Sequence, residues 1–362
     1  MVTKAFGVAV DPVALAVTLG VGALGGVIGH ALGLPLGLLL GALVAVGTMA
    51  ASGTRIAGHG VHLPQPLRFF FVPVIGVAIG GAFTPAVLAE MPGWWPSLLA
   101  LCLYIPLAHF AGFWLYRQGG LDRATAWFGA TPGGLIDSVL LGEAAGADEQ
   151  MLVLLQFLRL ILTVVAVPVG FMVLTGHAVG SAGGARIGVG SALLWGDLAL
   201  LAIAAVAGVW LGRKIRLPAA IMTGPVALSA AFHLAGWTEG VPPDWMVGVT
   251  QVVVGSALGA RFAGLPKGAF RRAATLASAN VAVALVLASG FALVLPQVVA
   301  VPVTGVFLAF APGGLAEMSL VALSLQVSVV FVTAHHVLRI GLSVLLAQAL
   351  WKRMIGPGAA SG

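Results

Sequence analysis

Two long stretches of this sequence contain no Asp, Glu, Lys or Arg: one runs from Asp11 to Arg55, the other from Arg272 to Glu317. At about 1.5 Å per helical residue, each stretch could cross a hydrocarbon core of roughly 30 Å twice. The chain is 60% hydrophobic and 8% charged, with a mean hydropathy of +1.10. Because an ordinary soluble domain carries roughly 25% charged residues, a soluble protein and a disordered one are both excluded. The sequence predicts a polytopic helical membrane protein.

The chain repeats itself about halfway along. The segment Ala130-Thr131-Pro132-Gly133-Gly134-Leu135-Ile136-Asp137 corresponds, position by position, to Phe310-Ala311-Pro312-Gly313-Gly314-Leu315-Ala316-Glu317. Leu158-Arg159 and Leu338-Arg339 follow at the same offset. Leu34-Pro35 with Leu217-Pro218, and Gly76-x-x-x-Gly80 with Gly255-x-x-x-Gly259, correspond at nearly that offset. Four markers in one order favour a duplication.

Apolar runs bounded by Pro, Gly or charge predict five spans in each half. They cover residues 13–32, 35–51, 66–83, 95–117 and 150–175, then 193–212, 218–236, 245–262, 273–295 and 328–351. One apolar segment per half remains, near 122–147 and 301–326. Each contains Pro-Gly-Gly, which interrupts a helix. Such a segment either crosses the membrane or enters and returns.

Positive charges favour return, because cytoplasmic loops carry an excess of Lys and Arg. If both segments return, fourteen cationic residues share one side: Lys4, Arg55, Arg68, Arg117, Arg123, Arg213, Lys214, Arg216, Arg261, Lys267, Arg271, Arg272, Lys352 and Arg353. Arg186 alone faces the other side, and Arg159 and Arg339 lie within spans. We therefore expect an all-α fold of two inverted five-span repeats, each with a re-entrant Pro-Gly-Gly hairpin, in the plasma (inner) membrane with both termini cytoplasmic.

The predicted domain boundaries follow from this scheme. Residues 1–178 form the first membrane repeat, 179–192 a Gly/Ser-rich linker, 193–354 the second repeat and 355–362 a flexible tail. Inverted repeats with broken helices at the midplane are typical of secondary transporters. The hairpin tips are therefore the first candidates for substrate binding: Thr131, Pro132, Gly133 and Gly134, with Ala311, Pro312, Gly313 and Gly314.

The run from Ala311 to Met318, followed by His335-His336-Val337-Leu338-Arg339, resembles the signature of the AbrB-type membrane protein family. The resemblance covers nearly the whole chain. It implies a duplicated membrane domain, in agreement with the topology above, and it carries the label of an ammonia monooxygenase. The first-half copy of the motif has Asp137 in place of Glu317 and Gln156 in place of His336.

Four ionisable residues occupy equivalent positions near the two Pro-Gly-Gly motifs. Asp137 and Glu317 fall in the first turn of the following helix, where a carboxylate either caps the free N–H groups or binds a coupling proton or cation. Arg159 and Arg339 follow them at equal distances along the chain, inside apolar helices. Each either forms a structural ion pair with the preceding carboxylate, or one of them remains partly free to bind a carboxylate or phosphate bidentately.

The adjacent His335 and His336 diverge by about 100° on a helix, so they do not readily share a metal. One of them either relays protons beside Glu317 or packs against a neighbouring helix. The glycine pairs Gly76/Gly80 and Gly255/Gly259 favour close helix packing, with a sliding surface as the alternative.

The leading functional hypothesis is a secondary transporter of a small organic solute, an anion such as a carboxylate, driven by a proton or sodium gradient. The first two or three helices of each half form a scaffold, and the hairpins with the Arg159 and Arg339 helices form the substrate-carrying unit. A channel or a membrane-embedded sensor is the alternative. We expect no enzyme activity and no metal or other cofactor, because only His59-x-x-His62 and the His335-His336 pair bring histidines close together in sequence. A homodimer through an exposed scaffold face stays open, and no nucleic-acid partner is expected.

Overall fold

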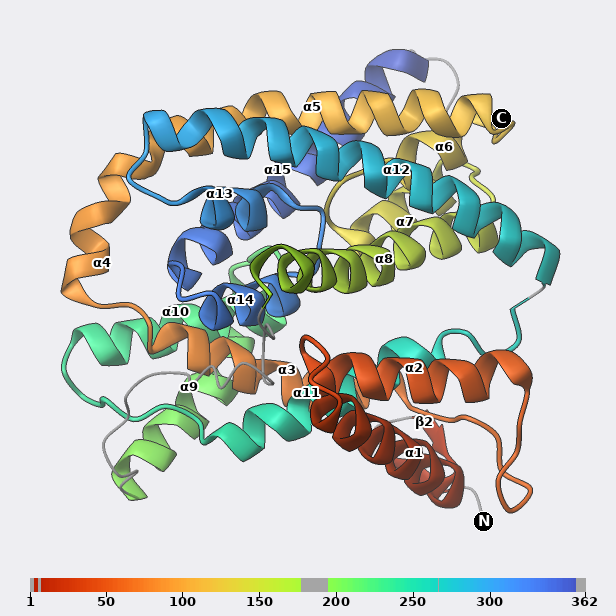
Figure 1. Cartoon of the computed structure of the whole chain (residues 1–362), viewed down its shortest axis with the longest axis horizontal. Helices are drawn as coiled ribbons and strands as arrows, with labels where there is room; N and C mark the ends of the chain where they lie inside the picture. The colour runs from red at the N-terminus through yellow and green to blue at the C-terminus, as the bar shows by residue number, and fades with distance from the viewer. Residues whose placement is uncertain (1–2, 6–7, 177–194, 266, 356–362) are drawn as a thin grey trace. The chain divides into compact units, whose positions relative to one another are not determined.

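The computed structural model describes residues 3–5, 8–176, 195–265 and 267–355. Within these ranges the chain is almost entirely helical (Figure 1). The α-helices are α1 (Pro12–Ala31), α2 (Gly37–Ser52), α3 (Gln65–Gly80), α4 (Pro85–Glu90), α5 (Trp95–Gln118), α6 (Arg123–Gly129), α7 (Leu135–Ala144), α8 (Glu149–Thr175), α9 (Trp195–Lys214), α10 (Ala220–Leu234), α11 (Asp244–Ala260), α12 (Lys267–Val294), α13 (Val303–Phe310), α14 (Leu315–Ser324) and α15 (Val329–Ile355).

Shorter elements accompany these helices. Two 3-10 turns, η1 (Met91–Trp94) and η3 (Leu295–Gln297), lie at the start of α5 and the end of α12. Near the N-terminus, β1 (Thr3–Ala5) pairs antiparallel with β2 (Val8–Val10), a short ribbon that the sequence did not predict. The predicted linker at 179–192 and the tail beyond residue 355 lie outside the described residues.

Six helical segments are long and apolar enough to span a membrane, which confirms a polytopic membrane protein. They are Pro12–Ala31, Pro85–Gln118, Glu149–Leu174, Trp195–Lys214, Gly268–Gln297 and Val329–Met354. A helix also occupies each of the four other predicted spans, but these helices, α2, α3, α10 and α11, have only 15 to 17 residues. The count of ten spans therefore stays a prediction.

The chain divides into two compact units, and each takes segments from both halves. Unit 1 comprises Met1–Ala89, Val165–Leu265 and Ser319–Val330. Unit 2 comprises Glu90–Val164, Pro266–Met318 and Phe331–Gly362. Unit 1 thus contains α1, α2 and α3 with α9, α10 and α11. Unit 2 contains α5, α6 and α7 with α12, α13 and most of α15.

Helix packing in unit 1 depends on glycines, and the same contacts occur twice. A Cβ atom on Gly41 of α2 would overlap the carbonyl oxygen of Gly25 on α1. At the equivalent positions of the second half, a Cβ atom on Gly224 of α10 would overlap the carbonyl oxygen of Gly208 on α9. The α1–α2 and α9–α10 pairs therefore pack backbone to backbone, because no side chain separates them.

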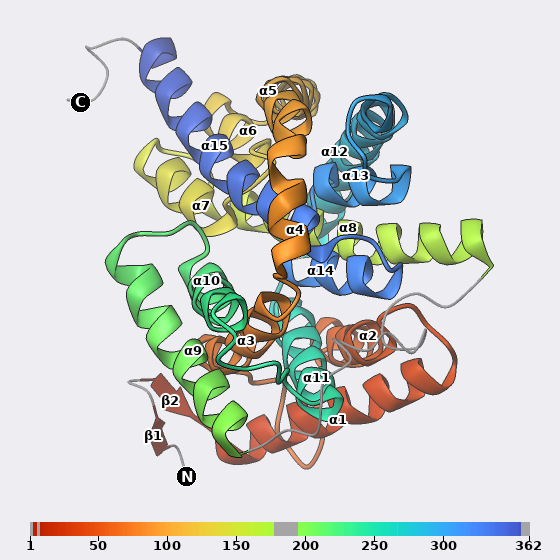
Figure 2. The ribbon, with the colours of Figure 1, turned by 90° about the vertical axis from the view of Figure 1, so that its left-hand side faces the viewer.

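A second set of glycines joins one half of the chain to the other within unit 1. The Cβ position of Gly255 on α11 meets the carbonyl oxygen of Leu39 on α2. In the reciprocal contact, the Cβ position of Gly76 on α3 lies 2.7 Å from the carbonyl oxygen of Met222 on α10. Figure 2 shows α11 beside α2 and α3. The predicted glycine pairs therefore lie at helix contacts.

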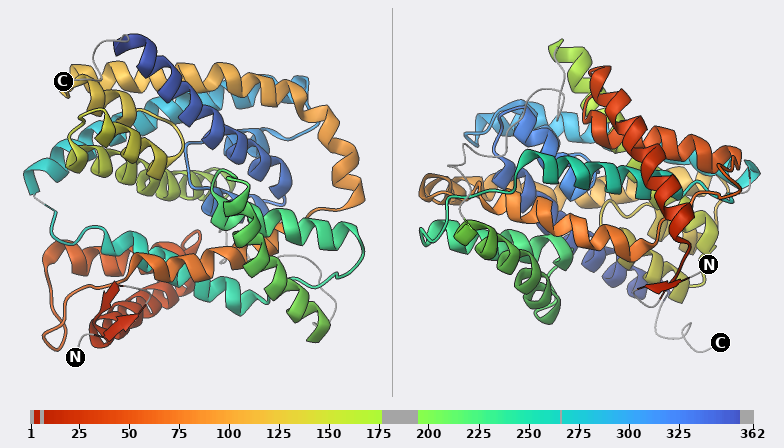
Figure 3. Two further views of the ribbon diagram at one scale, coloured as in Figure 1. Left: turned by 180° about the vertical axis from the view of Figure 1, so that it is seen from behind. Right: turned by 90° about the horizontal axis from the view of Figure 1, so that it is seen from below.

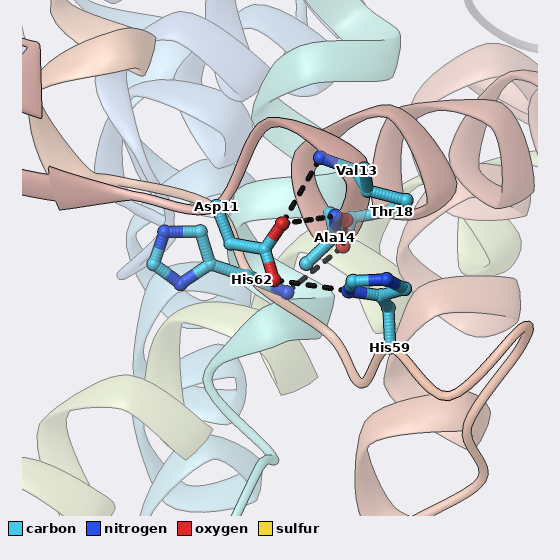
Figure 4. A network of polar contacts seen from close by, with 6 residues as sticks. All are labelled: Asp11, Val13, Ala14, Thr18, His59 and His62. Atoms are coloured by element: carbon cyan, nitrogen blue, oxygen red, sulfur yellow. Dashed lines mark hydrogen bonds and ion pairs between the residues drawn. The ribbon is translucent and has the colours of Figure 1, made fainter. Parts of the chain in front are cut away.

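The loop at residues 53–64 is held against the N-terminal end of α1 (Figure 4). Asp11 caps this helix by accepting hydrogen bonds from the backbone N–H groups of Val13 and Ala14, at 3.0 and 3.1 Å. Its other oxygen lies 3.0 Å from Nδ1 of His59. The backbone N–H of His62 donates to Oγ1 of Thr18 at 2.9 Å. These contacts place the start of α1 and the α2–α3 loop together.

Unit 2 is built around the antiparallel neighbours α5 and α12, which run side by side in Figure 1. Asn280 of α12 donates from Nδ2 to the phenol oxygen of Tyr116 on α5, at 3.0 Å. The helices α6 and α7 pack against each other (Figure 3), and Trp127 of α6 donates from its indole nitrogen to the carbonyl oxygen of Ala347 on α15, at 3.0 Å. This packing holds the two Pro-Gly-Gly segments within one compact unit.

Candidate functional site

Both Pro-Gly-Gly segments fold as two short helices separated by a break. The first break, residues 130–134, separates α6 from α7; the second, residues 311–314, separates α13 from α14. Gly134 has φ +69°, a left-handed conformation that favours glycine. The helix–break–helix form that the sequence predicts for 122–147 and 301–326 is therefore present. Whether these segments are re-entrant stays a prediction.

Each proline leaves one carbonyl oxygen of the preceding helix without its helical donor, because proline has no N–H group. For Pro132 this oxygen belongs to Phe128, and it accepts a hydrogen bond from Nε2 of Gln156 at 2.7 Å. For Pro312 the oxygen belongs to Leu308, and Nε2 of His336 lies 2.9 Å away. Gln156 and His336 thus perform the same task at equivalent positions of the two halves.

The two buried arginines also contact the breaks. Arg159 of α8 donates from Nη1 to the carbonyl oxygen of Thr131, the residue before Pro132. Arg339 of α15 donates from Nη1 to the carbonyl oxygen of Ala311, the residue before Pro312. Donor and acceptor stand at equivalent positions in the two halves. Each guanidinium therefore binds the last carbonyl group before its proline.

The side chain of Arg339 is more fully engaged than that of Arg159. Its Nη1 also donates to the carbonyl oxygen of Phe310 at 3.2 Å, and its Nη2 donates to that of Gly313 at 3.0 Å. Nη2 further lies 3.2 Å from Nδ1 of His336. Arg339 thus holds the second break through carbonyl oxygens and a ring nitrogen rather than through a carboxylate.

Of the two alternatives for Arg159, an ion pair with Asp137 is not formed in the described structure. Both residues lie in the described part of the chain, and no ion pair joins them there. Arg159 is 5% exposed, whereas Asp137 is exposed on the first turn of α7. A backbone carbonyl satisfies part of the buried guanidinium instead, an alternative that residue spacing did not reveal.

The two carboxylates differ in their surroundings. Glu317 is buried, at 6% exposed, in the first turn of α14, and its carboxylate folds back over Gly314 so closely that no Cβ atom fits there. The Cβ position of Gly134 lies 3.5 Å from Oδ2 of Asp137. Both carboxylates therefore have the first-turn position that the sequence predicts, which favours negative charge.

The two adjacent histidines are buried and point to different partners. His335 lies with Nδ1 2.8 Å from the carbonyl oxygen of Phe331 and Nε2 2.9 Å from Oγ of Ser97. His336 has Nε2 at a carbonyl oxygen and Nδ1 at a guanidinium donor. A nitrogen that faces a carbonyl must donate and one that faces a guanidinium must accept, so His336 fits a neutral ring protonated on Nε2. A role of either ring in proton movement stays a prediction.

The two breaks also pack against the opposite long helices. The Cβ position of Gly133 in the first break lies 3.2 Å from Cα of Ile340 and 3.3 Å from Oγ of Ser343, both on α15. The Cβ position of Gly314 in the second break lies 3.1 Å from a methyl group of Leu160 on α8. Unit 2 thus brings together the two arginine helices and both predicted tips.

Two buried guanidinium groups lie at the breaks, with the Glu317 carboxylate at the second break. The Arg159 guanidinium repels that of Arg339, and the phenols of Tyr104 and Tyr116 also act on Arg159. Several buried polar atoms near the breaks have no hydrogen-bond partner among the described residues: Oγ1 of Thr131, Oε1 of Gln156, Nε of Arg159, Nε of Arg339 and Oγ of Ser343. Buried polar atoms are normally paired, so these are candidates for contact with a ligand or water.

Reasoning from the sequence missed several of these groups. Gln156 appeared only as a diverged copy of His336, although a donor for the Phe128 carbonyl could have been sought, because Pro132 leaves that oxygen unpaired. Ser343, Tyr104 and Tyr116 carry no sequence pattern that separates them from ordinary helix residues. Within the described residues, no group of three or more His, Cys, Asp or Glu side chains could hold a metal ion.

Residues 46–355 match the protein family described as "Transition state regulatory protein AbrB". The chain belongs to the AbrB family. It is 25% identical over 299 residues to "Uncharacterized protein YhjN" of Bacillus subtilis (strain 168), covering 77% of this chain and 76% of that protein. It is also 25% identical over 317 residues to "Putative regulator AbrB" of Escherichia coli (strain K12), covering 84% of this chain and 88% of that protein.

Proposed function

We propose that this AbrB-family protein is a secondary transporter of a small organic anion such as a carboxylate. The observation that carries the proposal is the pair of buried guanidinium groups at two helix breaks within one apolar unit. An ionised group inside a membrane protein is costly and usually belongs to a substrate or ion pathway. Two like charges in one region favour an anionic ligand that offsets their repulsion.

The division of the chain supports a carrier. Unit 1 collects the first three helices of each half and packs them through glycines, as a scaffold requires. Unit 2 contains the breaks and both arginines. We interpret the reciprocal contacts, such as Gly255 with Leu39 and Gly76 with Met222, as the product of inverted repeats, and the breaks as re-entrant hairpins. Alternating access at the repeat interface is then the transport mechanism.

The energy source is an ion gradient, because the sequence has no GxxxxGK[ST] nucleotide-binding loop. Between the two carboxylates, Glu317 is the stronger candidate for the coupling proton, because it is buried and Asp137 is exposed. Sodium held by carbonyl oxygens of the breaks is the alternative. We expect Glu317→Gln to fold normally and to lose the pH dependence of transport. Unchanged pH dependence in this variant excludes Glu317 as the proton site.

Orientation and location follow from the charge distribution. We infer a plasma-membrane protein with both termini cytoplasmic, on the side that collects Lys4, Arg55 and the basic residues after α9 and α15. The contact between Asp11 and His59 agrees with one shared side for the N-terminus and the α2–α3 loop. Labelling of a cysteine introduced at Arg55 by an impermeant reagent, in intact cells and in inverted vesicles, tests this orientation.

A membrane sensor or a channel is the second candidate. The family's description and the name of the Escherichia coli relative both refer to regulation. A sensor binds the same anion without moving it, and a channel conducts it without saturation. We do not propose the monooxygenase activity of the family label; stoichiometric iron or copper in the purified protein, with oxidation of ammonia, would require it.

Counterflow in proteoliposomes separates these functions. The full chain is reconstituted, loaded with an unlabelled carboxylate and given the labelled compound outside, with acetate, lactate, succinate and citrate as the panel and methylamine as the cationic control. A carrier shows saturable uptake with transient overshoot. Linear, non-saturating flux indicates a channel. Absence of flux for every carboxylate, in vesicles with verified protein insertion, overturns the proposed transport function.

A further inference from the structure

The two arginines are equivalent in sequence but not in the contacts that they make. Arg339 donates to the carbonyl oxygens of Phe310, Ala311 and Gly313 and to the ring of His336. Arg159 makes one hydrogen bond, from Nη1 to Thr131. Its Nε and Nη2 atoms have no hydrogen-bond partner within the described chain. Nε and Nη2 form the edge of a guanidinium that binds a carboxylate through two parallel hydrogen bonds.

Gln156 accounts for part of this difference. Its Nε2 donates to the carbonyl oxygens of Phe128, Gly129 and Thr131, at 2.7, 3.2 and 3.3 Å. Of these oxygens only that of Thr131 corresponds to one that Arg339 binds, the oxygen of Ala311. Arg159 makes no contact equivalent to those of Arg339 with Phe310 and Gly313. Unlike the Nδ1 atom of His336, Nε2 of Gln156 also offers no acceptor to the neighbouring guanidinium. Arg159 is thereby left with an open edge.

Three unpaired polar atoms belong to the three residues that meet at the carbonyl oxygen of Thr131. This oxygen binds both Nη1 of Arg159 and Nε2 of Gln156. The unpaired atoms are Nε of Arg159, Oε1 of Gln156 and Oγ1 of Thr131, each buried and without a partner in the described structure. The amide orientation of Gln156 is fixed, because three carbonyl oxygens surround its Nε2, so Oε1 is an acceptor that faces away from them.

The open group needs a negative partner, and the described part of the chain supplies none. The ionisable side chains that act on Arg159 in the described part of the chain are Tyr104, Tyr116 and Arg339, and none of them is an anion at neutral pH. A ligand at this point must therefore bring an anionic group for Arg159, and a carboxylate fits its two parallel N–H groups. A hydroxyl group next to that carboxylate could donate to Oε1 of Gln156, whereas an ammonium group would be repelled by the guanidinium.

We infer that Arg159, Gln156 and Thr131 form the binding site for a small hydroxycarboxylate, whose carboxylate pairs with Nε and Nη2 of Arg159 and whose hydroxyl donates to Gln156. This inference rests on the proposed function, and it assigns the substrate to the first break rather than the second. Arg339 holds the second break in shape, because its Nη1 and Nη2 atoms are both engaged there, and only its Nε lacks a partner in the described structure.

The test uses three probes with the same three-carbon skeleton: lactate, propionate and alanine. Binding of labelled lactate to the full chain in lipid nanodiscs is measured, with the other two as competitors. We expect saturable lactate binding and competition by propionate roughly tenfold weaker, since propionate lacks one hydrogen bond to a buried acceptor. Alanine, which has no net charge, should compete more weakly than lactate. Equal competition by propionate overturns the assignment of the hydroxyl to Gln156.

The decisive variant is Gln156→His, which gives the first half the residue of the second half. The ring keeps a donor for Phe128 and supplies an acceptor for Nη2 of Arg159, one of the two acceptors that Nη2 of Arg339 has. We expect at least a tenfold rise in the Kd of lactate, with an unchanged melting temperature of the unliganded protein. Thr131→Val removes the unpaired hydroxyl and should weaken lactate binding, whereas Thr131→Ser keeps the hydroxyl and should bind lactate as the wild type does.

Thr163→Val is the control on the same helix, because its hydroxyl only bonds the backbone oxygen of Arg159, at 2.8 Å. It should leave lactate binding unchanged. This inference is refuted if the wild-type protein does not prefer lactate over propionate and the Gln156→His variant binds lactate as the wild type does. If the wild-type protein still transports carboxylates, the proposed transporter function stands. Lactate binding with the predicted variant effects, but without counterflow, supports the site and refutes the transporter.

Discussion

Replacing His336 by Leu or by Gln should have clearly different costs, because only one of the two keeps the donor that Leu308 needs. The carbonyl oxygen of Leu308 has no helical partner, since Pro312 lacks an N–H group, and Nε2 of His336 supplies the donor at 2.9 Å. Gln156 shows in the first half that an amide performs this task at the equivalent position, where its Nε2 lies 2.7 Å from the Phe128 oxygen.

The magnitude follows from the contacts that each variant loses. His336→Leu leaves a buried carbonyl unpaired, which costs about 1–3 kcal/mol. It also removes an acceptor from Nη2 of Arg339, but that nitrogen keeps the Gly313 oxygen at 3.0 Å. His336→Gln keeps the donor and loses at most one hydrogen bond, which inside membrane proteins averages about 0.6 kcal/mol. We therefore expect the Leu variant to be less stable than the Gln variant by about 1–2 kcal/mol.

The assay is reversible unfolding of the full chain in mixed detergent micelles with increasing dodecyl sulfate, followed by tryptophan fluorescence. The same pair of exchanges at the first break, Gln156→Leu against Gln156→His, serves as the internal comparison and should give the same order. If the Leu variants are as stable as their polar counterparts, the side chains at these positions do not satisfy the carbonyl groups that Pro132 and Pro312 leave without a helical donor. The assignment of His336 to a structural role then fails.

Further predictions concern unit 1. Gly255→Ala should destabilise the protein by about 1–3 kcal/mol, because the new Cβ overlaps the Leu39 carbonyl oxygen. The control Gly20→Ala, whose Cβ would have nothing within 4 Å, should leave the stability unchanged or raise it by up to about 1 kcal/mol. Equal melting temperatures of the two variants would contradict backbone contact between α2 and α11. The pKa of Asp11 is lowered from its ordinary value of 3.8, first by the hydrogen bond from the Ala14 N–H and further by His59. Because the pKa of Asp11 is lower in the folded protein, its stabilising contribution is present above pH 3.8 and is lost as the pH falls through the lower folded value. The melting temperature should therefore fall below about pH 4. Asp11→Asn keeps the cap and should reduce this fall. Asp11→Ala should lower the melting temperature at neutral pH, and an unchanged value there would exclude the cap as a stabilising contact.

Much of the fold could be predicted from local pattern. Long apolar runs predict helices because a chain in lipid must satisfy its own backbone hydrogen bonds. Each predicted span contains a helix whose ends lie within a few residues of the predicted limits, apart from the longer start of α12 at Lys267. The exceptions are short: α4 and the β1–β2 ribbon carry too few residues for a periodic signal. The breaks were predicted because Pro and Gly act through the local backbone alone.

The candidate site was predicted only in outline. Spacing identified Asp137 and Arg159 as possible partners and left open whether they form an ion pair or Arg159 stays partly free; the ion pair is not present in the described structure. The partner of Arg159 is a backbone carbonyl, and such an acceptor exists at every residue, so no sequence pattern marks it. Arg159 and Arg339 make different hydrogen bonds. Part of the reason is the residue one helical turn before each arginine, which is Gln156 in the first half and His336 in the second, and the carbonyl groups that this residue reaches.

By itself the sequence determined the membrane environment, the helices, the two proline breaks and the correspondence between the halves, since these depend on composition and on interactions a few residues apart. Only the tertiary structure decided which helices pack against which, that segments of both halves form each compact unit, and which buried polar atoms keep a free hydrogen-bonding edge. Those properties depend on atoms that are distant in the chain and meet only after folding, and in this protein they distinguish one arginine from its sequence equivalent.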